Sequence, residues 1–195
     1  MKLEPYYKEY HNVLSEEFCK HCIEKFKKSN VKSPGRTGNG LDTNVKDSTD
    51  LTISNESDWQ EEDKVFLDVL SPTLSEFNPN KQFNDQHIIF DTGYQIQETT
   101  PSQKGYIWHN DFKIIPHEYG YAHRIFTYIF YLNDVSQDGE TQLFNGVKIK
   151  PERGKLLLFL ADHNHWHRGI PPTSNTKYIC TGWVYKVDPF DMTWN

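Results

Sequence analysis

Residues 106–111 read Tyr-Ile-Trp-His-Asn-Asp and contain the side chains best suited to chemistry in this chain. Successive side chains of a β-strand point to opposite faces, so His109 and Asp111 are expected on the same face. This pair supplies two ligands of a metal site, and a second histidine is available at His163, His165 or His167. Two histidines and one carboxylate leave adjacent positions of an octahedral ion open, which is the arrangement of non-haem Fe(II) oxygenases.

A His-x-Asp pair is a weak signal in a chain with nine histidines, and the alternative is a surface histidine beside an aspartate in a turn. The surrounding residues make the signal more specific. In chain order they are Tyr106, Arg124, Thr127, Tyr-Leu-Asn at 131–133, Gly-Glu-Thr at 139–141, Lys177 and Trp183. With them the chain resembles the Fe(II)/2-oxoglutarate-dependent oxygenases, and within them the prolyl-4-hydroxylase-like branch, over about residues 94 to 187.

The resemblance implies which histidine is the third metal ligand. In the family this histidine precedes a basic residue by about nine or ten positions. Lys177 lies ten positions after His167 and twelve after His165. The implied catalytic and metal-binding set is therefore His109, Asp111 and His167, with His165 left as an outer or surface group, as is the histidine at 163.

The resemblance also implies the cofactors, which are Fe(II), 2-oxoglutarate as cosubstrate, O2, and ascorbate as a reductant. The carboxylate of 2-oxoglutarate that lies far from the metal needs a countercharge and a directed hydrogen bond. Lys177, Tyr131 and Thr141 have these roles by resemblance. The plainer interpretations are a core aromatic for Tyr131 and a lysine at the rim for Lys177.

The implied reaction is hydroxylation of an unactivated C–H bond, with succinate and CO2 as co-products. Radical halogenases of the wider superfamily have a small residue in place of the carboxylate, so Asp111 favours hydroxylation. Peptide prolyl hydroxylases contact the region of the target proline through residues that correspond here to Tyr106, Arg124 and Trp183. The expected partner and substrate is therefore a peptide or protein with a prolyl residue.

Three alternative functions are considered for this chain. The same scaffold could hydroxylate a free amino acid or other small molecule, and a non-catalytic jelly-roll binding module would keep the fold without turnover. Residues 138–141 contain one glycine where the branch usually has two, and residues 113–122 are an insert; both border the site and affect which substrate enters. A nucleic-acid demethylase of the AlkB type is disfavoured, because the second arginine of that family is absent and the chain is acidic.

Composition describes a chain with one core and a polar surface. The 195 residues have a mass of 23.0 kDa, a formal net charge of -6 and a mean hydropathy of -0.76. We expect one dioxygenase domain over 1–195, with helices and a polar loop in 1–80 and a jelly-roll core in 83–187. The charge argues against a nucleic-acid partner, and no apolar window is long enough to span a bilayer. A cytoplasmic protein is the expectation, with its three cysteines unpaired.

Two helices are expected before the β-rich region. Apolar residues recur every four positions over 14–26 and predict a helix over about 15–28, with Ser15 as the N-cap. A second helix is predicted after Asp58, which has a capping-box spacing, and Pro72 is expected to end or kink it.

The polar segment 30–57 is long for a loop within one domain, although a short strand at about 50–54 is expected to interrupt it. Glycines at positions 35, 38 and 40 give the backbone freedom around Arg36. We expect either a lid that orders over the site when peptide binds or an idle disordered connector.

After residue 84 the pattern changes to short strands separated by turn residues. The expected strands are 87–90, 94–97, 105–111, 124–132, 147–150, 156–160 and 177–187. So many short strands describe a sandwich or jelly roll. The predicted fold class is α+β, with a double-stranded β-helix (jelly-roll, cupin-like) core and the N-terminal helices packed on one sheet.

Overall fold

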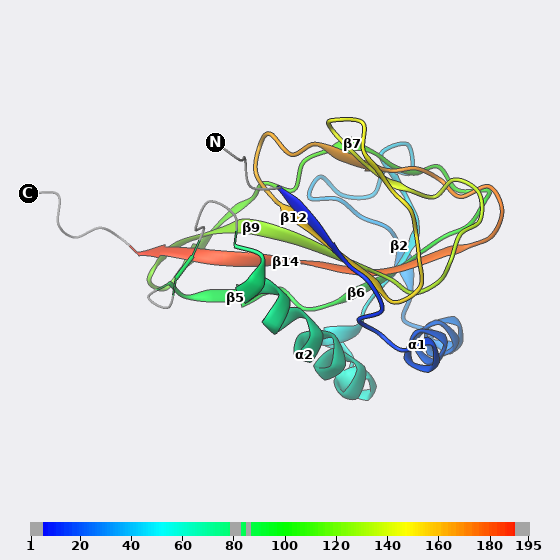
Figure 1. Ribbon diagram of the computed structural model, residues 1–195, viewed down its shortest axis with the longest axis horizontal. Coiled ribbons are helices and arrows are strands. Elements are labelled where there is room, and N and C mark those ends of the chain that lie inside the picture. The colour runs from blue at the N-terminus through cyan, green and yellow to red at the C-terminus, as the bar shows by residue number, and fades with distance from the viewer. Residues whose placement is uncertain (1–5, 79–82, 85–86, 190–195) are drawn as a thin grey trace, which may run out of the picture.

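The fold is that of a computed structural model, which describes residues 6–78, 83–84 and 87–189. It has three layers (Figure 1): helices α1 (Glu16–Lys28) and α2 (Gln60–Glu76), a larger β-sheet, and a smaller β-sheet on the other side of it. The predicted class, a β-sandwich with two helices on one sheet, is confirmed.

The larger sheet has the strand order β1-β12-β9-β14-β6-β4-β2, with β5 paired to β14 and β8 paired to β9. Its strands are β1 (Tyr7–Tyr10), β2 (Ser33–Pro34), β4 (Thr49–Thr52), β5 (Ile89–Asp91), β6 (Gln95–Thr99), β8 (Ile114–His117), β9 (Gly120–Tyr131), β12 (Lys155–Leu160) and β14 (Lys177–Pro189).

The smaller sheet has the strand order β11-β10-β13-β7-β3. Its strands are β3 (Lys46–Asp47), β7 (Gly105–His109), β10 (Thr141–Leu143), β11 (Lys148–Ile149) and β13 (His167–Gly169). Strand pairs in both sheets are antiparallel. The sheets therefore face each other as the two walls of a jelly roll.

The central strand β9 is buried on both faces, and the alternation of its side chains divides the core in two. Phe126, Tyr128 and Phe130 belong to the apolar cluster shared with the helices, whereas Ile129 and Tyr131 face the smaller sheet. Each buried aromatic of this kind stabilises the fold by about 1.5–3 kcal/mol. The helix side is filled by apolar side chains, and the space between the sheets is where polar groups collect.

Helix α1 begins as predicted, because the Ser15 hydroxyl accepts a hydrogen bond from the Phe18 N–H at 3.1 Å. Two glutamates in its first turn and three lysines in its last turn complement the helix dipole. Its apolar stripe, which includes Cys19, Cys22 and Phe26, is fully buried against the larger sheet. All three cysteines are free and buried.

Helix α2 departs from the prediction in two details. A short 3-10 turn at Ser57–Trp59 precedes it, and Asp58 does not cap it, since the helix start has no side-chain cap hydrogen bond. Pro72 lies inside the helix, which continues to Glu76. Burial on both sides of the proline outweighs the lost backbone hydrogen bond. The buried residues concerned are Phe66, Leu70 and Leu74.

All seven segments predicted as strands after residue 84 contain a strand. The insert at 113–122 forms β8 and the start of β9, which pair as a hairpin. The strands β1, β2, β3, β8, β10 and β13 were not predicted, because they are two to four residues long and too short for a periodic pattern.

The segment 30–57 is more regular than its composition indicates. Strand β4 corresponds to the strand predicted at 50–54, β2 pairs with β4 at the edge of the larger sheet, and β3 pairs with β7 of the smaller sheet. The longest connection between strands in this segment is residues 35–45. The lid hypothesis therefore applies to this shorter connection.

Among the residues that the structure describes, no helix combines the length and the apolar character needed to cross a membrane.

Candidate active site

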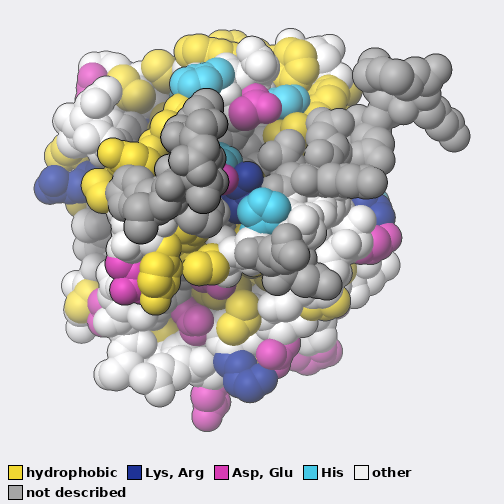
Figure 2. Space-filling model, turned by 90° about the vertical axis from the view of Figure 1, so that its left-hand side faces the viewer, with side chains coloured by type: hydrophobic (Ala, Val, Ile, Leu, Met, Phe, Trp, Pro, Cys, Tyr) yellow, Lys and Arg dark blue, Asp and Glu magenta, His cyan; other side chains and the backbone are white. Residues whose placement is uncertain are grey.

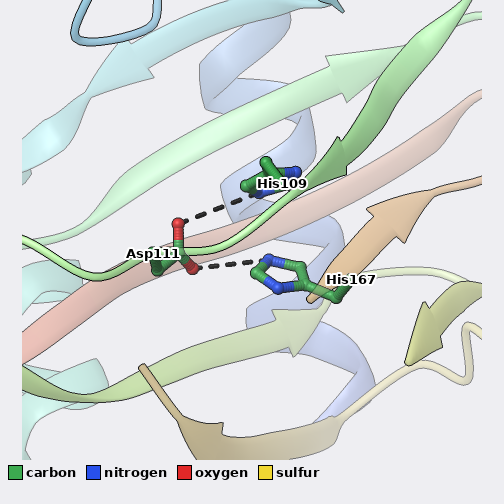
Figure 3. A group of neighbouring side chains, drawn as sticks. All are labelled: His109, Asp111 and His167. Atoms are coloured by element: carbon green, nitrogen blue, oxygen red, sulfur yellow. Dashed lines mark ion pairs between the residues drawn. The ribbon is translucent and has the colours of Figure 1, made fainter. Parts of the chain in front are cut away.

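Two strands of the smaller sheet bring the predicted metal ligands together. His109 ends β7 and His167 begins β13, and the two are register partners in the antiparallel pair. Asp111 follows two residues after His109, and its side chain faces both rings (Figure 3). One ligand atom from each of the three residues lies within 4.8 Å of the others. Nε2 of His109 is 3.8 Å from Asp111 Oδ1, and Nε2 of His167 is 3.4 Å from Asp111 Oδ2.

The hydrogen bonds around the three side chains leave the correct atoms free for a metal ion. Nδ1 of His109 lies 2.8 Å from the Ile107 carbonyl, and Nδ1 of His167 lies 3.3 Å from the His165 carbonyl, so Nε2 of each ring faces the carboxylate. Asp111 Oδ2 accepts a hydrogen bond from the Thr127 hydroxyl at 2.7 Å. Such outer partners fix the orientation of metal ligands. The donor set and its support therefore fit a ferrous ion.

Burial and neighbouring charges set the protonation states that a metal requires. Burial, together with the facing His167 ring, lowers the pKa of His109 to about 4, so its imidazole is neutral at physiological pH. Burial alone would raise the pKa of Asp111, but the two rings and the Thr127 hydrogen bond overcome it and hold that pKa below its usual range. A neutral imidazole and an ionised carboxylate are the forms that bind a metal.

A β-bulge places Tyr106 on the same face as His109. Three steps along β7, from Tyr106 to His109, lie opposite only two steps of β13, from Gly169 to His167. The rings of Tyr106 and His109 consequently stack, with centroids 3.5 Å apart and an interplanar angle of 14°. At the start of this strand, Gly105 has a φ of +74°, and a Cβ there would lie 2.4 Å from the Gly169 carbonyl oxygen, so glycine is required.

A cavity of about 660 Å³ opens between the two sheets beside the three ligands. Lys177 and Thr141, which the sequence predicts to bind 2-oxoglutarate, both line it. Lys177 is only 4% exposed, and its ammonium donates hydrogen bonds to the carbonyls of Gly139 and Ile170 at 2.9 and 3.3 Å. Burial lowers the pKa of Lys177 to about 8. A dianion in the cavity would supply the countercharge that this ammonium lacks.

Tyr131 is placed differently from Lys177. Its side chain is fully buried in the core between the sheets, and its hydroxyl donates to Thr141 Oγ1 at 2.7 Å. The cavity is lined by Thr141 and not by Tyr131. The structure thus connects Tyr131 to the cavity through Thr141, and a direct contact with 2-oxoglutarate stays a prediction.

The three residues predicted to bind substrate all line the cavity. Arg124 lies flat over Trp183, with 3.7 Å between the guanidinium carbon and the ring centroid. Its Nε donates to the Tyr185 hydroxyl at 2.9 Å and its Nη1 donates to the Asp111 carbonyl at 3.2 Å. The indole N–H of Trp183 is buried and has no hydrogen-bond partner among the described residues. Arg124 and Trp183 are therefore held in fixed positions beside the metal ligands.

The neighbouring histidines lie outside the ligand group. Nδ1 of His165 is 2.6 Å from Asp162 Oδ1, and its ring packs against Tyr6. His163 stacks on Phe112, with 3.6 Å between the ring centroids. The geometry thus agrees with the choice of His167 as the third ligand.

Sequence reasoning missed several groups at the site. Thr127 was noted only as part of a motif, although its hydroxyl supports Asp111. Lys46 and Asp50 form a buried ion pair of 2.5 Å that the Ser48 hydroxyl joins at 2.7 Å, and both Lys46 and Ser48 line the cavity. These groups come from a segment that reads as a loop, so no local pattern could identify them.

Residues 94–185 match the model of the 2OG-Fe(II) oxygenase superfamily. Two curated proteins of Arabidopsis thaliana are similar in sequence. "Probable prolyl 4-hydroxylase 9" is 31% identical over 37% of this chain and 34% of its own length, and "Probable prolyl 4-hydroxylase 6" is 25% identical over 90% and 67%. The chain therefore spans about a third of the length of one relative and two thirds of the other.

Solved structures share the fold at low sequence identity. A prolyl hydroxylase of Trichoplax adhaerens, in complex with a peptide of the hypoxia inducible factor oxygen degradation domain, has a TM-score of 0.73 and 22% identity, covering 92% of this chain and 83% of that one. A prolyl-4-hydroxylase of Pseudomonas putida has a TM-score of 0.68 and 15% identity, covering 91% of each chain. The viral collagen prolyl hydroxylase of Paramecium Bursaria Chlorella virus-1, solved with 2OG, has a TM-score of 0.64 and 21% identity, covering 94% and 97%.

Proposed function

Residues 94–185 form a domain of the 2OG-Fe(II) oxygenase superfamily, and from this premise we propose that the protein is a hydroxylase of prolyl residues in a peptide or protein. The observation that carries the proposal is the location of three groups on one cavity: the ligands His109, Asp111 and His167, the buried cation Lys177, and the Arg124–Trp183 pair. The names of the similar proteins support the prolyl substrate.

The residues of this chain would have separate roles in such a reaction. His109, Asp111 and His167 would hold Fe(II), which with 2-oxoglutarate and O2 supplies the oxidation of an unactivated C–H bond, giving succinate and CO2 as co-products. Lys177 would bind the far carboxylate of 2-oxoglutarate, and the Thr141 hydroxyl lies on the same cavity.

Arg124 and Trp183 form one wall next to the metal ligands. The Arg124 hydrogen bond to the Asp111 carbonyl ties this wall to the ligand set, so a substrate residue resting on Trp183 would be held at a fixed position relative to the metal. Orientation of the target C–H bond is therefore the contribution of this pair.

The cavity reaches the molecular surface, which favours a peptide over a small molecule. Its lining includes exposed residues, among them Arg36, Lys113 and Trp108. A free amino acid would be expected in a cavity enclosed on all sides.

The test is incubation of proline-containing peptides and cell-extract proteins with the protein, Fe(II), 2-oxoglutarate and ascorbate. We expect mass spectrometry to show the gain of one oxygen on a prolyl residue, together with succinate release. Oxygen gained only by free amino acids would support the small-molecule alternative. Peptide binding without succinate release would identify a non-catalytic binding module.

A further inference from the structure

The charged residues that line the cavity differ in sign from the protein as a whole. The chain has 27 acidic and 21 basic residues. The cavity lining has one acidic residue, the metal ligand Asp111, and six basic ones. The basic residues are Arg36, Lys46, Lys113, Arg124, Arg168 and Lys177. Positive charge is thus concentrated at the one place where a substrate enters an acidic protein.

Three of these cations already have partners inside the fold. Lys177 donates to two backbone carbonyls deep in the cavity, Arg124 is bonded to Tyr185 and to the Asp111 carbonyl, and Lys46 is paired with Asp50. The other three come from three separate elements around the cavity. Arg36 lies in the connection between β2 and β3, Lys113 immediately precedes β8, and Arg168 is in β13.

The side chains of Arg36 and Lys113 are exposed, and within residues 6–78, 83–84 and 87–189 neither makes an ion pair or a hydrogen bond. Arg168 is held by its Nε, which donates to Gln142 Oε1 at 2.8 Å, and by the ring of Trp108 at 5.1 Å. Its terminal guanidinium N–H groups have no hydrogen-bond partner in the described part of the chain and remain available to a ligand.

Some exposed cations elsewhere in the described chain are paired with a carboxylate, as in Lys20–Glu16 and Lys64–Asp68, whereas others, such as Lys148 and Lys150, make no ion pair there. Arg36 and Lys113 are distinguished by their position, because both line one cavity. Although the chain is acidic, none of its carboxylates forms an ion pair with Arg36 or Lys113 among the described residues. Cations left unpaired around one opening attract an anionic partner and increase its rate of encounter.

From this distribution we infer that the mouth of the cavity selects acidic substrates, namely peptide segments that carry Asp or Glu side chains close to the target residue. The inference rests on the proposed function and specifies its substrate class. On the face shown in Figure 2, a hollow near the middle contains a basic side chain, and histidine, acidic and hydrophobic side chains lie around it. A peptide with a few carboxylates and an apolar target residue matches such a surface.

Nucleic acid is a poorer match for the same charges. Its binding depends on a continuous row of cations that displaces many counterions, whereas this opening offers three cations on separate walls of a protein with a net charge of -6. A few discrete carboxylates need only a few discrete cations. The peptide is therefore the partner that we test.

The experiment uses three peptides of equal length that differ only in the residues flanking a central proline, which are Glu, Gln or Lys. Binding to the full chain, loaded with Mn(II) and 2-oxoglutarate, is measured by fluorescence anisotropy at low and high salt. We expect the Glu peptide to bind about tenfold more tightly than the Gln peptide at low salt, with the Lys peptide weakest, and the difference to shrink at high salt.

Variants of the exposed cations at the cavity mouth test which residues cause the preference for the Glu peptide. Arg36→Gln and Lys113→Gln should each weaken binding of the Glu peptide about two- to fivefold and leave the Gln peptide unchanged, as for exposed ion pairs. Lys148→Gln is the matched control, because Lys148 is an exposed lysine of β11 that does not line the cavity. Its binding of all three peptides should equal that of the parent protein.

Equal binding of the Glu and Gln peptides would overturn the inference. Stronger binding of a single-stranded oligonucleotide than of the Glu peptide, lost in the same variants, would overturn it in favour of nucleic acid. Hydroxylation is measured separately with Fe(II). A Glu preference in binding without oxygen gain on any peptide would refute the proposed prolyl hydroxylation and leave the charge preference standing, whereas equal hydroxylation of the Glu and Gln peptides would refute only the inference.

Discussion

Two buried lysines of the larger sheet, Lys155 on β12 and Lys177 on β14, have opposite surroundings. Lys155 is 2% exposed, and its ammonium lies 2.8 Å from Glu9 Oε2 and 3.1 Å from Glu152 Oε2. Lys177 is 4% exposed and bonds only to carbonyls, with no ion pair among the described residues. A buried charge without a countercharge is costly, so it persists where a ligand completes it.

The contrast separates structure from function within one sheet. The Lys155 ion pairs link β12 to the N-terminal strand β1, which carries Glu9. Lys177 makes no ion pair among the described residues, and burial lowers its pKa although the nearby Glu140 carboxylate acts in the opposite direction. Stability should therefore depend on Lys155, and ligand binding on Lys177.

The largest effect is expected from removing one of the three metal ligands, which line the same cavity as Lys177. His109→Ala, Asp111→Ala or His167→Ala should abolish turnover and weaken iron binding by more than the ~10–100-fold that loss of an outer partner costs. Calorimetry with Fe(II) or Mn(II) and a succinate assay measure the two effects. His165→Ala is the control, because His165 is bonded to Asp162 outside the ligand group. Activity that survives His167→Ala and is lost in His165→Ala would contradict the assignment.

The next effect concerns Lys177 itself. Lys177→Met should raise the Kd of 2-oxoglutarate by about 10–150-fold, since a hydrogen bond to a charged group contributes ~1.5–3 kcal/mol. Metal affinity should hardly change. The free energy of unfolding of the ligand-free variant should equal or exceed that of the parent protein, because an uncompensated buried charge has been removed.

Lys155→Met is the matched control, with the reverse outcome. It leaves Glu9 and Glu152 without their cation and should lower the free energy of unfolding by about 1–3 kcal/mol. The Kd of 2-oxoglutarate should stay the same. Chemical denaturation and calorimetry on both variants test the division, and destabilisation by Lys177→Met as large as that by Lys155→Met would remove it.

Much of this site could be predicted from sequence because its residues follow one another in a fixed order and at short spacings along the chain. The spacing from His109 to Asp111 and from His167 to Lys177 specified four residues that the structure brings to one cavity. Strand alternation alone would place Tyr106 on the face opposite His109. The bulge in β7 reverses this, and no residue in the sequence signals it.

Groups that act through distant partners could not be predicted. The Glu9–Lys155 pair joins residues at opposite ends of the chain, and its members read as an ordinary surface acid and a strand lysine. The Lys46–Asp50 pair becomes buried only because β3 joins the smaller sheet and β4 joins the larger one. Pro72 was expected to end or kink α2, and it does not end the helix, because packing against the sheet overrides the local preference.

A smaller effect is expected from pH, and it concerns Lys177 alone. Only the protonated lysine attracts the carboxylate of 2-oxoglutarate, and burial lowers the pKa of Lys177 to about 8. Affinity should be constant below pH 8 and should fall above it, by up to about tenfold per pH unit. Titrations of 2-oxoglutarate with Mn(II)-loaded protein across this range measure it.

Lys177→Arg is the control for the pH experiment, because an arginine stays charged throughout and its affinity should not fall above pH 8. The ligand-free parent protein should show the linked effect on folding. The unfolded chain, with its ordinary lysine pKa of 10.5, holds more protons than the folded one between pH 8 and 10.5. Lys177 therefore makes the free energy of unfolding rise across this window. A 2-oxoglutarate affinity that does not change with pH would show that Lys177 does not bind the far carboxylate of 2-oxoglutarate.

The smallest effect is expected from the connection at the cavity mouth. Deleting residues 33–40 removes β2, which is the outermost strand of the larger sheet, together with Arg36 and its neighbours on the cavity lining. The deletion leaves Lys155 and Lys177 in place, so the Kd of 2-oxoglutarate and the free energy of unfolding should change little. The KM for a peptide should rise about two- to fivefold, which is the contribution of an exposed ion pair.

The point variant Arg36→Gln separates the two ways in which this segment could act. If the segment contributes through its charge, the deletion and the point variant should raise the peptide KM equally. If it also orders over bound peptide as a lid, the deletion should raise KM further and lower kcat, because closure holds the target residue beside the metal. Unchanged peptide kinetics in a folded deletion variant would leave the segment as a connector, and the substrate would then be gripped only by the wall that Arg124 and Trp183 form.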